Sequence, residues 1–96
     1  MHRVVAAWPS FERWTTGMQL VRAADSIGAN IAEASGRWHK ADKRRLLIIA
    51  RGSLYETEHW LVRAATRDLV TESYDARIAE IARMLSGLIT RPSPSR

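Results

Sequence analysis

The stretch that decides the fold runs from Arg22 to Arg37 and reads RAADSIGANIAEASGR. Its stripe of alanines and isoleucines recurs at spacings of three or four residues, the pattern of a helix with one buried face. Gly36 stands where helices commonly end. We predict a helix that begins after Thr16, because Thr16 and Gln19 have the spacing of a capping box, and that ends at Gly36.

This helix carries polar residues beside its apolar stripe. The main stripe consists of Leu20, Ala23, Ile27, Ile31 and Ala34, and a separate strip of mostly small residues consists of Val21, Gly28 and Ala32. Ser26, Asn30 and Glu33 form a polar file at the margin of the main stripe. We interpret them, together with Ser53 of the next helix, as a structural polar seam between packed helices; the alternative is a ligand contact. Arg37, four residues after Glu33, is placed to neutralise it.

Two more helices follow, one from about Asp42 to Asp68 and one that starts after Thr71 and runs to about Thr90. The core stripe of the longer helix is Leu47, Ala50, Leu54, Thr57, Leu61 and Ala64, widened by Leu46, Ile49, Ser53 and Trp60. A second apolar series on another face, Ile48, Tyr55, Val62 and Leu69, recurs every seven residues. Because one bundle cannot easily cover both faces, we predict an oligomer interface that includes Val21, Gly28, Ala32, Ile48, Tyr55 and Val62.

Size and composition favour a small all-α domain that gains from a partner surface. The chain has 96 residues, close to the size at which a single core only just suffices. The sequence contains no cysteine, which excludes a disulfide framework and thiolate metal sites. No apolar run approaches the roughly 20 residues of a membrane span, and the N-terminus does not have the layout of a signal peptide. We therefore expect a cytoplasmic protein.

The net charge of +5 is concentrated in one window. Residues 37–51 hold six basic residues and a single acidic one, whereas the remainder of the chain is balanced. We name as candidate nucleic-acid contacts, hereafter the basic corner, Arg37, Trp38, Lys40, Lys43, Arg44, Arg45 and Arg51. An exposed indole among cations can stack on an unpaired base. The competing interpretation is a solvated helix start that helps solubility, with Trp38 packed on the neighbouring hairpin.

Neither a metal site nor a catalytic site is predicted. Glu56 and His59 have the Glu-x-x-His spacing of di-iron bundles, but such a site needs a second motif and two further carboxylates facing inward. His2 and His39 belong to no comparable motif, and Ser53 is not part of a nucleophile elbow. We expect no metal, no cofactor and no enzymatic activity.

Three segments in this order resemble a known family: QLVRAADSIGANIAEASGR (19–37), IARGSLYETEHWL (49–61) and MLSGLI (84–89). The resemblance is to the four-helix bundle protein family, which includes proteins encoded in intervening sequences of bacterial 23S rRNA genes. That family is similar to the accessory variability protein of diversity-generating retroelements. The resemblance implies an antiparallel four-helix bundle, a ring-like homopentamer and no established enzymatic activity. In the retroelement branch it also implies a basic surface that engages nucleic acid and the reverse transcriptase.

The chain departs from this family at its start. Family members have a complete first helix before the segment WPSFERW (8–14), whereas here only six residues follow Met1 before it. We expect residues 1–14 to be a remnant of the first helix and its connector, residues 15–90 to form the bundle and residues 91–96 to be a disordered tail. The chain is either a natural truncation or has its start codon placed too late, and the hypothesis we carry forward is that in-frame codons upstream of Met1 encode the missing helix. The fold class expected is thus an all-α, antiparallel up-and-down bundle with three long helices and a truncated first one.

The functional expectation is a non-enzymatic, homo-oligomeric protein whose basic corner binds RNA or DNA, as an accessory or scaffold. The alternative is a purely protein-binding homo-oligomeric scaffold whose basic corner docks an acidic partner.

Overall fold

The computed structural model describes residues 1–91, and these form helices and loops without a strand. The elements are α1 (His2–Ala6), α2 (Ser10–Glu12), the π-helical segment η1 (Arg13–Gly17), α3 (Met18–Ser35), α4 (Lys40–Thr66) and α5 (Asp75–Thr90). The predicted all-α, up-and-down architecture with three long helices and a short first one is therefore confirmed. The predicted disordered tail lies outside the described residues, apart from Arg91.

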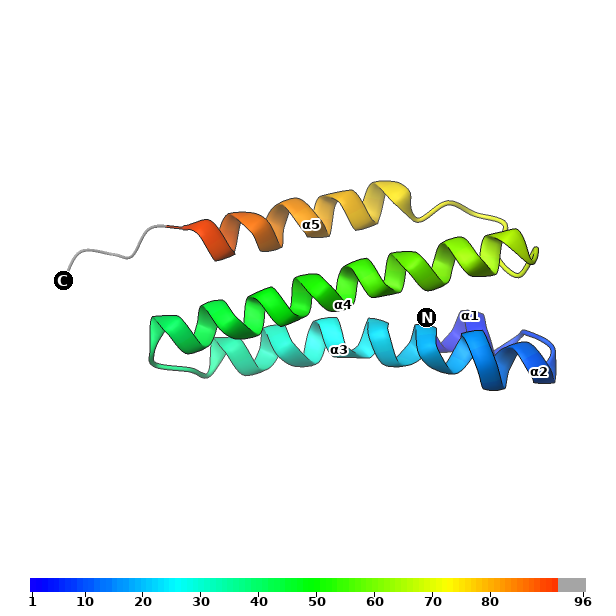
Figure 1. The fold of residues 1–96 in the computed structure, drawn as a ribbon, viewed down its shortest axis with the longest axis horizontal. Coiled ribbons are helices and arrows are strands. Elements are labelled where there is room, and N and C mark those ends of the chain that lie inside the picture. The colour runs from blue at the N-terminus through cyan, green and yellow to red at the C-terminus, as the bar shows by residue number, and fades with distance from the viewer. Residues whose placement is uncertain (92–96) are drawn as a thin grey trace.

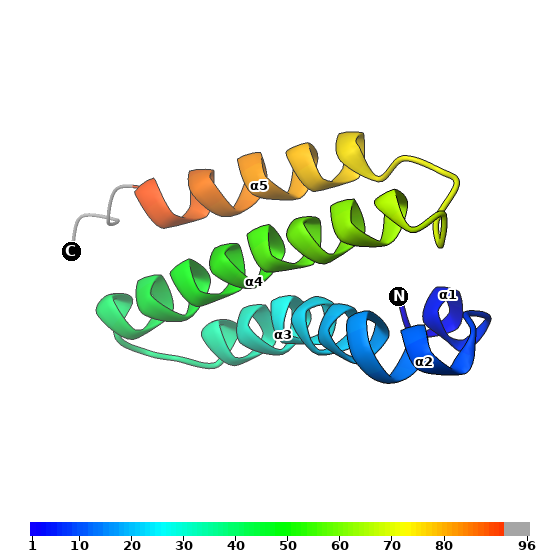
Figure 2. The same ribbon diagram turned by 45° about the vertical axis from the view of Figure 1, so that its right-hand side comes forward.

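The three long helices lie side by side, each antiparallel to the next, with α4 in the middle (Figures 1 and 2). Within the described part of the chain, no Cα atom of α3 comes within 8 Å of one in α5. The molecule measures 54 × 22 × 16 Å along its principal axes. The long helices thus form a flat layer, and the short helix α1 packs near the beginning of α3 at one end (Figure 1).

The core follows the central helix. Leu54 of α4 is 1% exposed, as is Leu85 of α5, while Leu20 of α3 is wholly buried. The other apolar residues of the buried cluster are Val5, Trp8, Ala50, Leu61, Ala64 and Ile78. Because α4 contacts both α3 and α5, its apolar positions carry most of the packing in the layer.

Helix α3 begins at Met18, close to the predicted start after Thr16, but the predicted capping role of Thr16 is wrong. The helical chain begins at Ser10 and passes through η1 into α3, so Thr16 lies inside it and does not act as a cap. Thr16 is buried, and its Oγ1 accepts a hydrogen bond from Arg67 Nη1 at 3.0 Å. A tertiary partner from the end of α4 therefore uses the hydroxyl that local sequence assigns to a capping box.

The other helix limits differ by a few residues. Helix α4 begins two residues earlier than predicted, and α5 begins at Asp75 rather than after Thr71. Ser73 supplies the hydroxyl at the start of α5, where its Oγ accepts a hydrogen bond from the backbone N–H of Asp75 at 3.2 Å. The predicted ends at Gly36 and Thr90 agree with the structure.

Ile49 was predicted in the core and lies outside it, with 42% of its surface exposed. The reason is geometric, because α4 has long-helix neighbours on two sides only and part of its surface is left open. None of the helices within residues 1–91 is both long and apolar enough to cross a membrane.

Candidate nucleic-acid interface

The basic corner lies where α3 ends and α4 begins, at the end of the layer away from α1 (Figure 1). Trp38 belongs to the connecting loop and is 96% exposed, so in the single chain it does not pack on a neighbouring hairpin as the alternative interpretation expects. Four cations on the first turns of α4 are exposed as well: Lys40, Lys43, Arg44 and Arg45. An unshielded indole therefore stands beside a group of solvent-facing cations.

Most of this charge has no acidic partner among residues 1–91. The ion pair found there joins Arg37 to Glu33, one helical turn apart and both partly exposed. Arg51 is half-buried, and its Nη1 donates a hydrogen bond to Ser86 Oγ of α5 at 3.2 Å. Arg51 thus contributes to the α4–α5 contact, while the cations on the first turns of α4 stay free to meet an anion.

The polar seam joins α3 to α4 through three residues. The hydroxyls of Ser26 and Ser53 are 2.9 Å apart, and Asn30 Nδ2 donates to Ser26 O at 2.8 Å and to Ser26 Oγ at 3.0 Å. Ser53 is nearly buried at 9% exposure. Glu33, which was predicted in the same seam, instead faces solvent beside Arg37. The seam therefore satisfies polar groups between helices and offers no carboxylate to a ligand.

The predicted oligomer residues on α4 are solvent-facing in the single chain. Tyr55 is 50% and Val62 55% exposed, and Ile48 is 36% exposed. On α3, Gly28 and Ala32 are exposed, whereas Val21 is half-buried. Val21 also lines a groove beside α1, together with Val5 and Met18. Ile48, Tyr55 and Val62 of the apolar series thus stay partly exposed, whereas Leu69, beyond the end of α4, packs against the core.

Glu56 and His59 are both exposed on α4. The His59 ring meets Trp60 edge to face, with ring centroids 4.8 Å apart. Across residues 1–91, no three His, Asp or Glu side chains are grouped closely enough to hold a metal ion.

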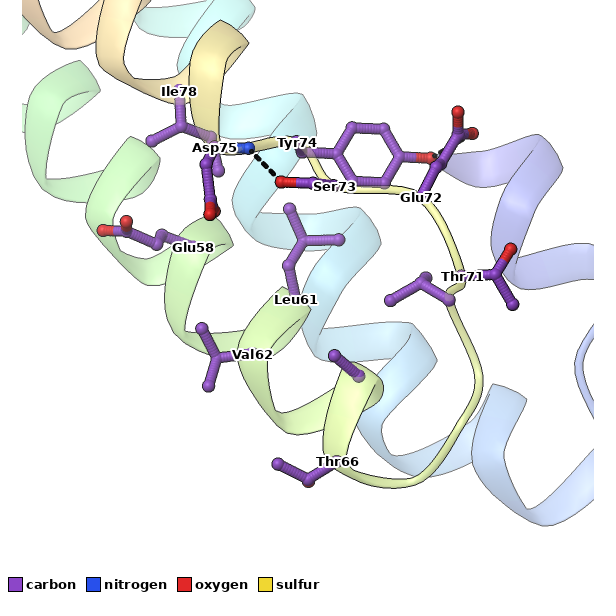
Figure 3. Close-up of a pocket in the computed structure, with 12 residues that line it drawn as sticks. Glu58, Leu61, Val62, Thr66, Thr71, Glu72, Ser73, Tyr74, Asp75 and Ile78 are labelled. Carbon is purple, nitrogen blue, oxygen red and sulfur yellow. Dashed lines mark hydrogen bonds between the residues drawn. The ribbon is translucent and has the colours of Figure 1, made fainter.

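A hollow of about 460 Å³ lies at the other end of α4, where it faces the start of α5 (Figure 3). Its lining includes the carboxylates of Glu58, Glu72 and Asp75. Tyr74 Oη donates a hydrogen bond to Glu72 Oε1 at 3.2 Å, and burial together with this bond raises the pKa of Tyr74. Carboxylates repel phosphate, so this acidic hollow is not suited to nucleic acid.

A second hollow of about 570 Å³ lies within the basic corner, between the start of α4 and the end of α5. We call it the basic hollow. Its lining residues are Lys40, Lys43, Arg44, Leu47, Leu88, Ile89, Thr90 and Arg91. The two ends of the molecule therefore carry hollows of opposite charge.

With this geometry in hand, the chain was compared with known proteins. The family model described as 23S rRNA-intervening sequence protein matches residues 1–88. The chain belongs to this family. The resemblance seen in the sequence is thereby confirmed. Neither the curated proteins nor the solved structures that were compared contain a match.

Arg91 lines the basic hollow and is a candidate site residue that the sequence analysis missed. The prediction grouped cations by their nearness in sequence, and Arg91 is far from Lys40 along the chain. The antiparallel order of the helices was predicted, and it places the end of α5 beside the start of α4. The predicted antiparallel order could therefore have identified Arg91 as a candidate member of the basic corner.

Proposed function

We propose that this chain is a non-enzymatic, homo-oligomeric helical-bundle protein that binds RNA or DNA through its basic corner, as an accessory or scaffold protein. The observation that carries the proposal is the set of exposed, unpaired cations on the first turns of α4. Among residues 1–91 the ion pairing is limited to Arg37 and Glu33. The side chains of Lys40, Lys43, Arg44 and Arg45 are therefore exposed to solvent without an acidic partner.

This arrangement costs stability in the absence of an anion. Cations at a helix N-terminus oppose the helix dipole, and cations close together repel one another. A phosphate backbone removes both penalties and releases its own condensed counterions on binding. The corner is therefore less favourable alone than when a polyanion covers it.

Trp38 adds a surface for a base. Its indole is almost fully exposed, and base stacking on an aromatic side chain contributes about 1–3 kcal/mol in single-strand binding proteins. Cations and an aromatic ring side by side are the usual composition of a surface that binds single-stranded nucleic acid.

The oligomeric part of the proposal is supported by the exposed apolar series on α4. Ile48, Tyr55 and Val62 recur every seven residues and remain uncovered in the single chain. A second copy that buried this series would supply apolar area that a flat layer of helices does not supply by itself. The same series favours the alternative function, a protein-binding scaffold whose basic corner docks an acidic protein.

Fluorescence anisotropy with labelled single-stranded RNA across a salt series tests the nucleic-acid function. We expect binding at low salt that weakens as salt rises, with each phosphate contact contributing about −0.7 to the slope of log K against log salt. The double variant Lys43→Glu/Arg44→Glu should bind weakly. Its matched control, Arg77→Glu/Arg83→Glu, makes the same change in net charge on exposed positions of α5 and should bind as the wild type.

The absence of binding at low salt would refute the nucleic-acid function and leave the protein-binding scaffold. Equal losses in the two double variants would show that net charge is responsible, and the basic corner would then not be the site.

A further inference from the structure

The basic hollow combines cationic side chains with apolar ones, and a surface that binds only phosphate does not need the apolar ones. Its charged side chains are Lys40, Lys43, Arg44 and Arg91, with no carboxylate among the described residues that line it. Its apolar floor is provided chiefly by Leu47, which is half-buried, and by Leu88, which is 40% exposed. The volume of about 570 Å³ falls within the roughly 300–1,000 Å³ of small-ligand sites.

The charge comes from two elements that are distant in sequence. Lys40, Lys43 and Arg44 stand on the first turns of α4, and Arg91 directly follows the last residue of α5. The N-cap residue of α4, His39, makes no side-chain capping hydrogen bond, so among residues 1–91 no cap satisfies the first N–H groups of this helix. Both features attract an anion to the rim of the hollow.

The apolar floor of the hollow favours a ligand that carries an apolar or flat group beside its anionic group. Thr90 Oγ1 already donates to Ser86 O at 2.9 Å, so the hydroxyl at the rim is engaged within its own helix. The apolar side chains that line the hollow among these cations are Leu47, Leu88 and Ile89. A base pressed against apolar side chains, with its phosphate on nearby cations, fits this distribution.

We infer that the basic hollow binds one unpaired nucleotide, with the base against Leu47 and Leu88 and the phosphates on the surrounding cations. This inference rests on the proposed function and narrows its ligand to single-stranded nucleic acid. A duplex keeps its bases stacked and paired, so it presents phosphates to the rim and leaves the floor empty.

Two measurements test the inference. The first is the anisotropy of a labelled single strand compared with the same strand annealed to its complement, in RNA and in DNA versions. The affinity for both single strands should exceed that for the duplexes about tenfold. If the preference holds for RNA alone, the ribose hydroxyl contributes to the same site.

The second measurement uses variants of the hollow. Leu88→Asp places a carboxylate on the floor and should weaken single-strand binding about tenfold while leaving duplex binding within twofold. Its control is Met84→Asp, one turn earlier on α5 at a residue that is 61% exposed and outside the hollow. Arg91→Glu, at an exposed residue beyond the helix, should also weaken single-strand binding and should lower the salt slope by about 0.7. Its control is Arg83→Glu.

Equal affinity for single strands and duplexes, with loss of both in Lys43→Glu/Arg44→Glu, would overturn this inference and leave the proposed function standing. A single-strand preference that survives both Leu88→Asp and Arg91→Glu would overturn it as well, since Trp38 would then be its source. If the wild type binds none of the probes, the proposed function fails and the inference fails with it.

Discussion

Gly17 lies where helix α1 approaches the π-helical segment η1. It belongs to the π-helical segment η1 and is buried. A Cβ atom built there would lie 2.5 Å from Val5 Cγ1 and 3.0 Å from the carbonyl oxygen of Glu12. The absence of a side chain thus lets α1 pack onto η1, and Glu12 O belongs to the backbone, which has little freedom to move away.

We predict that Gly17→Ala destabilises the protein although alanine is the better helix former. The added methyl group overlaps its neighbours, and overpacking of this kind lowers the free energy of unfolding by about 1–3 kcal/mol. Urea denaturation followed by circular dichroism measures the change. Gly87→Ala on α5 is the control, because nothing lies within 4 Å of its Cβ, and it should raise the free energy of unfolding by about 0.5–1 kcal/mol. A stabilising Gly17→Ala would mean that α1 does not pack on η1.

At the level of elements, the three long helices were predictable because their apolar spacing repeats over many turns. Leu54 and Leu61 were assigned to the core from spacing alone and are buried, since helix α4 is contacted along both sides. Helix starts were less predictable, because hydroxyl side chains such as that of Thr16 can serve a distant partner instead of a local cap. The burial of Ile49 was predicted wrongly for a related reason, because an apolar stripe in the sequence does not reveal how many sides of a helix are covered by other helices.

The candidate site was predictable only in part for the same reason. The cations of α4 follow one another in the sequence, so their charge was visible as a cluster. The basic hollow depends instead on the approach of α5 to α4, and no local pattern marks Leu88 or Arg91 as its members.

Helix α5 depends on its contact with α4. Leu85 is 1% exposed, and Leu85→Ala should lower the free energy of unfolding by about 2–5 kcal/mol because it leaves a cavity in that contact. Native-state hydrogen exchange should show the largest loss of protection in α5, with α3 affected less. Met84→Ala, on the exposed side of the same turn, should change neither quantity appreciably. An equally small effect of Leu85→Ala would contradict the packing described for α5.

At the scale of the whole molecule, a layer this thin exposes large apolar side chains that a closed bundle would cover. Tyr55 and Val62 are each at least half exposed on the central helix. The proposed assembly of copies places this series in contact with another subunit.

We predict that Tyr55→Glu shifts the protein from an oligomer toward a 10.9 kDa monomer in size-exclusion chromatography with light scattering. A carboxylate in an apolar interface is costly, whereas at a half-exposed position of the single chain it is tolerated. Ala79→Glu on the exposed surface of α5 is the control and should leave the oligomer unchanged. A wild-type protein that elutes as a monomer, or an oligomer that resists Tyr55→Glu, would contradict the assembly.

Mapping where nucleic acid contacts the chain tests most directly whether the basic corner is the binding site. Single-stranded RNA that carries a photoreactive uridine can be cross-linked to the protein at low salt, and the attached peptides can be identified by mass spectrometry. The cross-links should fall on the α3–α4 loop with the first turns of α4, around Trp38 and Lys43, and on the end of α5 near Arg91. Cross-links confined to the opposite end of the layer, around the acidic hollow or α1, would contradict nucleic-acid binding at the basic corner.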